Sequence, residues 1–114
     1  MQERRESRRN TFHLRTEVLL NEGQEQIGLL RANVAFGGIG GFSRDLVQEG
    51  QPAVVRIYFP QRGSEKETSE NIPGLIIWKK QDGNFTALGV RFSTLQRGAH
   101  PLLHSYLNYA DQFD

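Results

Sequence analysis

Residues 72–92 read IPGLIIWKKQDGNFTALGVRF, and this stretch decides the fold class of the chain. Two apolar segments, 72–80 and 85–92, flank a polar tetrapeptide that contains Asp82-Gly83. An Asp-Gly pair between two runs rich in β-branched and aromatic residues is typical of a β-hairpin, because the tight turn favours residues that adopt positive φ. The stretch therefore predicts two antiparallel strands joined by a short turn.

Further strands are predicted on the N-terminal side of this hairpin. Residues 12–20 alternate between apolar and polar side chains, which is typical of a half-buried strand, and a turn at 21–24 precedes a second strand at 26–35. Residues 53–59 are rich in β-branched and aromatic residues and predict a strand. The polar segment 60–71 predicts a loop. Four glycines within 37–41 favour a tight turn, a bulge or a surface that a ligand approaches closely, rather than a regular strand.

The chain ends in a predicted amphipathic helix that runs from about His100 to Asp111. Pro101 suits the first helical position. About six short strands followed by one helix indicate a mainly β fold, a small antiparallel barrel or sandwich. A chain of 114 residues is expected to form one domain. Apolar residues recur at helical spacing near the C-terminus, at Leu102, Leu103, Tyr106, Leu107, Ala110 and Phe113.

Composition excludes several classes of protein. The chain has no cysteine, which excludes disulfides, thiol nucleophiles and thiolate metal sites and fits a reducing cytoplasm. The apolar run 75–78 is far too short to cross a bilayer, and the charged N-terminus lacks the apolar region of a signal peptide. We therefore expect a cytoplasmic protein without membrane insertion.

The net charge of +1 is unevenly distributed along the chain. Residues 1–15 hold five arginines and two glutamates, a balance of +3 that leaves −2 for the remainder. The guanidinium group offers a planar fork of donors that suits phosphates and guanine edges. The alternative is a solvated arm that only aids solubility. The five arginines are Arg4, Arg5, Arg8, Arg9 and Arg15.

No pattern in the sequence favours catalysis or a metal site. His100 and His104 have a spacing that can place two ligands on one helix face, but no glutamate lies between them in a metalloprotease pattern and Pro101 occupies the helix start. Ser43 and Asp45 have no plausible histidine partner, and the sequence contains neither a nucleophile elbow nor a phosphate-binding loop. We therefore expect surface histidines, no metal and no enzymatic activity.

Two short motifs occur in a suggestive order. Residues 4–9, RRESRR, contain Arg-x-x-x-Arg at Arg5 and Arg9, and residues 33–38, NVAFGG, read Asn-x-Ala-x-x-Gly. An apolar strand ending in Trp78, a Gly-Val-Arg-Phe segment at 89–92 and the C-terminal helix follow. In this order the features resemble the PilZ domain, the bacterial cyclic di-GMP receptor module, over nearly the whole chain. The resemblance implies a six-stranded β-barrel over residues 12–114, preceded by a flexible basic arm over residues 1–11.

The resemblance also implies which residues bind cyclic di-GMP. The chemistry agrees with it, because guanine presents two adjacent acceptors to a bidentate arginine and phosphate oxygens accept from the same fork. Ala35 replaces the serine of the family motif and removes a hydroxyl group. The implied ligand-binding residues are Arg4, Arg5, Arg9, Asn33, Ala35 and Gly38, with weaker candidates Arg8, Gly37 and Trp78.

Alternatives remain for individual residues and for the whole protein. The segment from Asn33 to Gly38 is alternatively a plain β-turn with a capping asparagine. Trp78 is alternatively a core or barrel-rim aromatic. Arg91 is alternatively a solvated charge. The resemblance implies a stand-alone receptor, without a cofactor, that orders its arm on the ligand and relays the signal to a protein partner. One alternative is a PilZ-like interaction module of the pilus or motility type that does not bind the nucleotide. Another is a barrel for single-stranded nucleic acid, which the acidic body disfavours.

Overall fold

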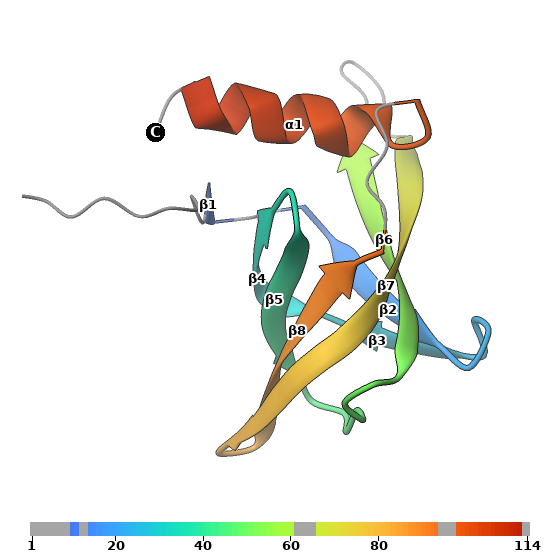
Figure 1. Ribbon diagram of the computed structural model, residues 1–114, viewed down its shortest axis with the longest axis vertical. Coiled ribbons are helices and arrows are strands. Elements are labelled where there is room, and N and C mark those ends of the chain that lie inside the picture. Colours follow the sequence, from blue (N-terminus) through green and yellow to red (C-terminus); the bar gives the residue numbers. More distant parts are fainter. Residues whose placement is uncertain (1–9, 12–13, 61–65, 94–97, 113–114) are drawn as a thin grey trace, which may run out of the picture.

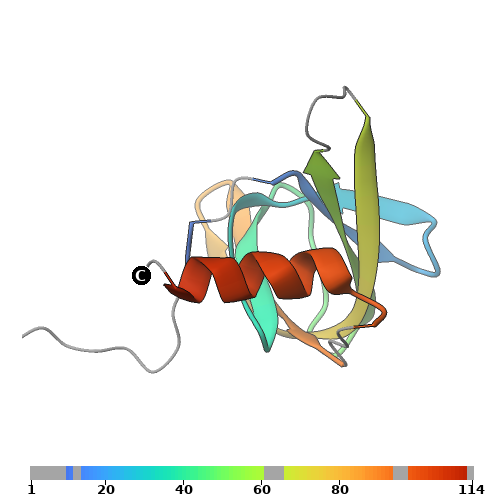
Figure 2. The ribbon, with the colours of Figure 1, turned by 90° about the horizontal axis from the view of Figure 1, so that it is seen from above.

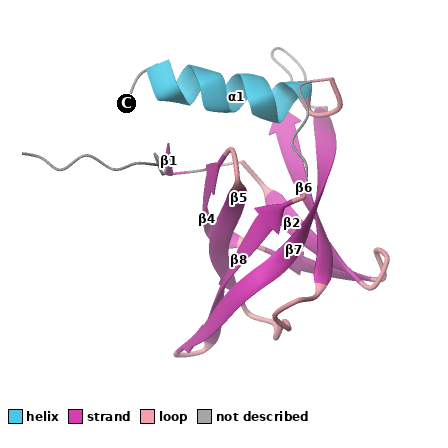
Figure 3. Cartoon of the chain, viewed as in Figure 1, coloured by secondary structure: helices cyan, strands magenta, loops and turns pink. Residues whose placement is uncertain are grey.

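The computed structural model describes residues 10–11, 14–60, 66–93 and 98–112, whose elements are drawn in Figure 1. Eight strands in this part of the chain form one antiparallel sheet in the order β1-β4-β5-β8-β7-β6-β2-β3. The sheet curls into a half-barrel, and the helix α1 lies across its upper end (Figures 1 and 3). The bounds are β1 Asn10–Thr11, β2 Thr16–Leu20, β3 Glu25–Gly28, β4 Leu30–Ala35, β5 Gly38–Ser43, β6 Pro52–Pro60, β7 Glu67–Asp82, β8 Phe85–Phe92 and α1 Pro101–Gln112.

The predicted fold class is confirmed as mainly β with one C-terminal helix, although the sheet has eight strands where six were expected. The hairpin around Gly83 is confirmed as the turn between β7 and β8, and Gly83 has a φ of 63°. The strand predicted at 12–20 begins at Thr16 within the described residues, and residues 12–13 lie outside them. The strand predicted at 26–35 is divided into β3 and β4, because the chain turns at Leu29 and Arg31 adopts a φ of 52°.

The prediction that the glycine cluster departs from a regular strand is wrong from Gly38 onward, since residues 38–43 form β5. Only Phe36 and Gly37 make the turn. A Cβ atom on Gly38 would lie 2.2 Å from the carbonyl oxygen of Val90, and one on Gly41 would lie 2.7 Å from Cγ of Leu29. Tertiary packing therefore requires glycine at these positions of the strand, although glycine has a low β-strand propensity.

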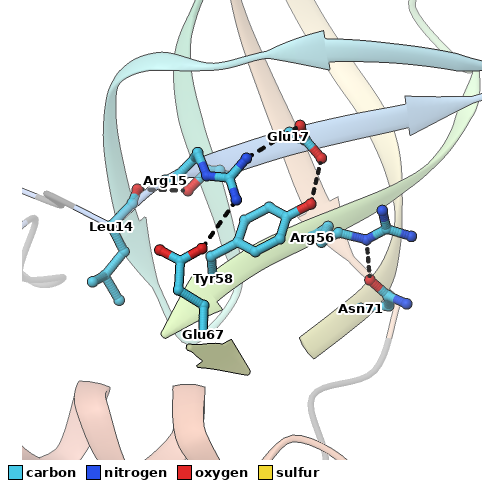
Figure 4. A network of polar contacts seen from close by, with 8 residues as sticks. Leu14, Arg15, Glu17, Arg56, Tyr58, Glu67 and Asn71 are labelled. Atoms are coloured by element: carbon cyan, nitrogen blue, oxygen red, sulfur yellow. Dashed lines mark hydrogen bonds and ion pairs between the residues drawn. The ribbon is translucent and has the colours of Figure 1, made fainter. Parts of the chain in front are cut away.

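The predicted loop at 60–71 is wrong for residues 67–71, which are the first part of β7 and pair with residues 56–60 of β6. Residues 61–65 lie outside the described part. Side-chain contacts stabilise this polar end of the hairpin (Figure 4). Arg15 donates to Glu67 at 3.0 Å, and Arg56 donates to Asn71 at 3.0 Å.

Arg15 belongs to the folded body and not to the basic arm. Its guanidinium carbon lies 3.7 Å from the centroid of the Tyr58 ring, and Tyr58 in turn donates its hydroxyl proton to Glu17 at 2.9 Å (Figure 4). The hydrogen bond to Glu67 raises the pKa of Arg15 above its ordinary value, so this cation stays charged throughout the physiological range. The charge of Arg15 is thus engaged by acidic neighbours, Glu67 and Glu17.

The core lies inside the curl of the sheet and beneath the helix (Figure 2). Along β6 every second side chain is buried, as expected for a strand with one face on a core. Leu103 and Leu107 of α1 complete this core, so the helix closes one end of the half-barrel. The buried side chains of β6 are Ala53, Val55, Ile57 and Phe59.

A buried carboxylate from β7 holds the start of α1. Glu70, only 8% exposed, accepts hydrogen bonds from the backbone N–H groups of Leu102 at 2.7 Å and Leu103 at 2.9 Å. The first N–H groups of a helix have no partner inside the helix, and a negative charge at that end is favourable. Glu70 therefore couples the sheet to the helix.

We predict that Glu70→Ala lowers the free energy of unfolding by about 2 kcal/mol, because it removes a helix cap and leaves two backbone N–H groups without a partner in a largely buried place. The measurement is urea unfolding followed by circular dichroism. Glu67→Ala is the matched control, since it removes a glutamate of the same strand whose exposed ion pair with Arg15 contributes less than about 1 kcal/mol. Equal losses for the two variants would contradict the capping role.

Candidate functional site

Strand pairing brings residues from distant parts of the chain into two adjacent rows that cross the sheet. In the first row Asn33 of β4 pairs with Gly40 of β5, Gly40 with Gly89 of β8, and Gly89 with Trp78 of β7. In the second row Ala35 pairs with Gly38, Gly38 with Arg91, and Arg91 with Leu75. The predicted motif residues Asn33, Ala35 and Gly38 therefore come together with Trp78.

Glycines form the floor between Asn33 and Trp78. The position for a Cβ atom on Gly40 lies 3.7 Å from Oδ1 of Asn33 and 3.5 Å from the carbonyl oxygen of Leu88, both ordinary contact distances. Gly89 is covered instead by the indole, since a Cβ atom there would lie 2.2 Å from Nε1 of Trp78. The floor next to Asn33 is thus backbone without a side chain, although Gly40 itself is buried.

A β-bulge at Ile77 sets the direction of Trp78. The register of β7 against β8 shifts between Ile76 and Trp78, so Ile77 is the extra residue. Simple alternation from the buried Ile72 and Ile76 would direct Trp78 into the core, but after the bulge it is 44% exposed. The interpretation of Trp78 as a core aromatic is therefore wrong, because it lies on the outer face.

Ten residues line a shallow groove of about 300 Å³ on this face. Arg91 is the one charged side chain among these described lining residues, and it is exposed. A groove with a flat glycine floor, an aromatic wall and a single cation suits a planar anionic ligand. The lining residues are Ala35, Gly37, Gly38, Ile39, Gly40, Ile77, Trp78, Gly89, Val90 and Arg91.

The short strand β1 ties the N-terminal segment to this site. Asn10 pairs with Val34 and Thr11 pairs with Asn33, so the chain enters β1 from the Ala35 end of β4. Asn10 directly follows Arg9 in the sequence. The predicted ligand-binding arginines Arg4, Arg5, Arg8 and Arg9 lie outside the described residues.

The tip of the β4–β5 hairpin rests against the helix. The ring of Phe36 meets the ring of His104 edge to face, with 5.4 Å between centroids and an angle of 72°. Residues 33–38 do not form a plain β-turn capped by asparagine, because Asn33 lies within β4 and the turn is at Phe36 and Gly37. The helix thus supports the segment that carries the motif.

The two predicted helix histidines do not share a site. His100 is buried, with Nε2 at 3.1 Å from the carbonyl oxygen of Asn71, whereas His104 contacts Phe36 and Asn108. His100 is therefore not the surface residue that the sequence predicts. Among the described residues no three histidine, aspartate or glutamate side chains are grouped so as to hold a metal ion. The described part of the chain also contains no helix with the length and apolar character needed to cross a membrane.

The sequence analysis did not include three residues of the site among the predicted ligand-binding residues: Gly40, Gly89 and Arg91. Gly40 was noted only as one of four glycines that favour a turn, a bulge or the close approach of a ligand, and Arg91 as a solvated charge. The signal that could have found them is the register of β5 against β8, which places Gly40 opposite Gly89 and Gly38 opposite Arg91. Register follows from the whole sheet and is not visible in either segment alone.

The fold and the groove define a small curled-sheet domain with a ligand-sized depression on its outer face. The profile of the PilZ domain family matches residues 2–109, which is nearly the whole chain. The chain therefore belongs to the PilZ domain family. A search of the curated proteins gives no match.

Two solved structures have a similar fold. The inhibitor of motility MotI/DgrA from Bacillus subtilis has a TM-score of 0.71 and 19% identity, and the match covers 98% of this chain and 53% of that one. This chain thus spans about half the length of that relative. The PilZ domain of YcgR from Escherichia coli, solved with c-di-GMP, has a TM-score of 0.62 and 16% identity, with 96% of this chain and 93% of that one covered.

Proposed function

We propose that this protein is a receptor for cyclic di-GMP, which binds in the outer groove and is clamped by the N-terminal arginines. The observation that carries the proposal is the meeting of three separate segments at one place. Asn33 and the glycine floor lie in β4 and β5, Trp78 reaches the same floor from β7, and β1 pairs Asn10, the residue after Arg9 in the sequence, with Val34 of β4. The related YcgR domain with c-di-GMP supports the choice of ligand.

The chemistry of the groove fits the parts of this ligand. Cyclic di-GMP is a dianion with two planar guanines. The exposed indole of Trp78 offers a face for base stacking, and the side chain of Asn33 is an amide, the kind of group that pairs with a guanine edge. Gly37, which is exposed, and Gly38, which is half-buried, leave backbone in the groove that a base can approach closely. Ala35 provides no hydroxyl group, so more of the affinity depends on the arginines.

The arm supplies the remaining cations. β1 fixes Asn10 beside Val34, and covalent geometry keeps Arg5 within about 18 Å of Asn10. Arg5 and Arg9 can therefore both reach an anion above the groove. Each contact to a charged group contributes about 1.5–3 kcal/mol, which offsets the entropy of ordering the arm at about 1–2 kcal/mol per residue.

We further propose that the ordered arm is the output of the receptor. Docking of residues 1–9 over the groove would cover one surface and create another, which a protein partner can recognise. The similarity to a B. subtilis protein named as an inhibitor of motility supports a regulatory output of this kind. In this proposal the chain acts by contact and not by catalysis.

Calorimetric titration of the full chain with cyclic di-GMP tests the proposed function. The chain has one tryptophan, so ligand in the groove is also expected to change the fluorescence of Trp78. GTP and a short oligonucleotide serve as controls for a general phosphate or nucleic-acid site. Absence of heat and of a fluorescence change with cyclic di-GMP would refute the receptor function and favour the interaction module.

We predict that the titration ends near two ligands per chain. Two stacked cyclic di-GMP molecules carry four negative charges, which the four arginines Arg4, Arg5, Arg8 and Arg9 can balance. Arg4→Leu is expected to move the end point toward one. An end point near one for the unmodified protein would contradict this stoichiometry and leave Arg4 as a simple phosphate contact.

A further inference from the structure

Arg91 is the cation that lines the groove, and three other cations of the folded body have partners elsewhere. Arg15 is engaged by Glu67, Arg56 donates to Asn71, and Lys79 donates to the carbonyl oxygen of Val47. The side chain of Arg91 is exposed and makes no hydrogen bond or ion pair with another described residue. An arginine without a carboxylate partner keeps its donors for a ligand.

The surroundings of Arg91 favour an anion in the groove. The side chain arises from β8 directly opposite Gly38, and the indole of Trp78, which covers Gly89 two residues earlier on the same face, lines the same groove. None of the described residues that line the groove is acidic. A single cation in a groove without acidic lining residues produces a positive potential where a ligand enters.

The position of Arg91 also differs in kind from that of the arm arginines. β8 lies in the interior of the sheet between β5 and β7, so the backbone that carries Arg91 is already ordered before a ligand arrives. Little backbone entropy is lost when a strand that is already paired on both sides presents the donor. Arg91 can therefore make the first contact with an anion.

We propose that Arg91 is a phosphate-binding residue of the groove, the cation among its lining residues that holds a phosphate of the ligand. This inference rests on the proposed function, since it names a further contact of the same ligand. A phosphate contact depends on charge more than on the fork geometry, because lysine binds phosphate as a point charge. A contact to a guanine edge would instead require the bidentate fork of arginine.

The test is titration of Arg91→Gln, Arg91→Lys and unmodified protein with cyclic di-GMP, each in the full chain. We expect Arg91→Gln to weaken binding about 10- to 30-fold and Arg91→Lys to stay within about 3-fold of the unmodified protein. Lys80→Ala is the matched control, because Lys80 is an exposed cation of neighbouring β7 that does not line the groove. The affinity of the Lys80→Ala variant for cyclic di-GMP is expected to differ from that of the unmodified protein by less than about 2-fold.

Each result decides a different point. Unchanged affinity in Arg91→Gln, with tight binding by the unmodified protein, overturns the role of Arg91 and leaves the receptor function intact. Equal losses in Arg91→Gln and Arg91→Lys overturn the phosphate contact in favour of a base contact. If the unmodified protein does not bind cyclic di-GMP, the receptor function and the role of Arg91 both fail. Thermal unfolding of each variant confirms that the exposed substitutions leave the fold unchanged.

Discussion

Arg5→Ala and Arg9→Ala are each expected to weaken the binding of cyclic di-GMP by about 100-fold or more. Each substitution removes charge-assisted hydrogen bonds to the dianion, and a loss of about 3 kcal/mol corresponds to that factor. Both residues precede the first described strand, so the free energy of unfolding is expected to change by less than about 0.5 kcal/mol. Calorimetric titration and thermal unfolding measure the two quantities separately.

The control for these variants is Arg56→Ala. Arg56 lies on β6, where it donates a hydrogen bond to Asn71 and does not line the groove. Arg56→Ala removes one positive charge, as Arg5→Ala does, and leaves the proposed site intact. Equal affinities for Arg5→Ala, Arg9→Ala and Arg56→Ala would show that the arm does not hold the ligand, even if the groove binds it.

Gly38→Ala is expected to lower the free energy of unfolding by about 3 kcal/mol, or more than about 10 °C in Tm, in the absence of ligand. The added Cβ atom would lie 2.2 Å from the carbonyl oxygen of Val90, so β5 must move away from β8. The requirement for glycine at the end of the Asn-x-Ala-x-x-Gly motif is then explained by the packing of the sheet itself. Thermal unfolding by circular dichroism provides the measurement.

Gly40→Ala is the matched variant on the same strand and the same face. Its Cβ atom meets only ordinary contact distances, so its stability is expected to stay within about 0.5 kcal/mol of the unmodified protein. The methyl group would nevertheless occupy the groove floor beside Asn33, and the affinity for cyclic di-GMP is expected to fall. If Gly40→Ala destabilises the protein as much as Gly38→Ala, the described register of β5 against β8 is wrong.

The local pattern of residues was sufficient for much of the fold. The Asp82-Gly83 turn, the alternating burial of residues 53–59 and the helix after Pro101 were predictable, because each depends on neighbours a few residues apart in the chain. The segments 38–43 and 67–71 were predicted wrongly for one shared reason. Their strand conformation comes from pairing with a neighbouring strand, β8 for the first segment and β6 for the second, which overrides a poor local propensity.

The sequence by itself determined the family, the arginine and asparagine motifs, and the chemistry that suits a guanine nucleotide. Only the tertiary structure decided how these parts meet. The bulge at Ile77 turns Trp78 from the core to the outer face, and strand register sets Gly89 between Trp78 and Gly40. The same register brings Arg91 opposite Gly38. Side-chain direction in a sheet reverses with every one-residue shift, so such a groove exists only once all the strands have paired.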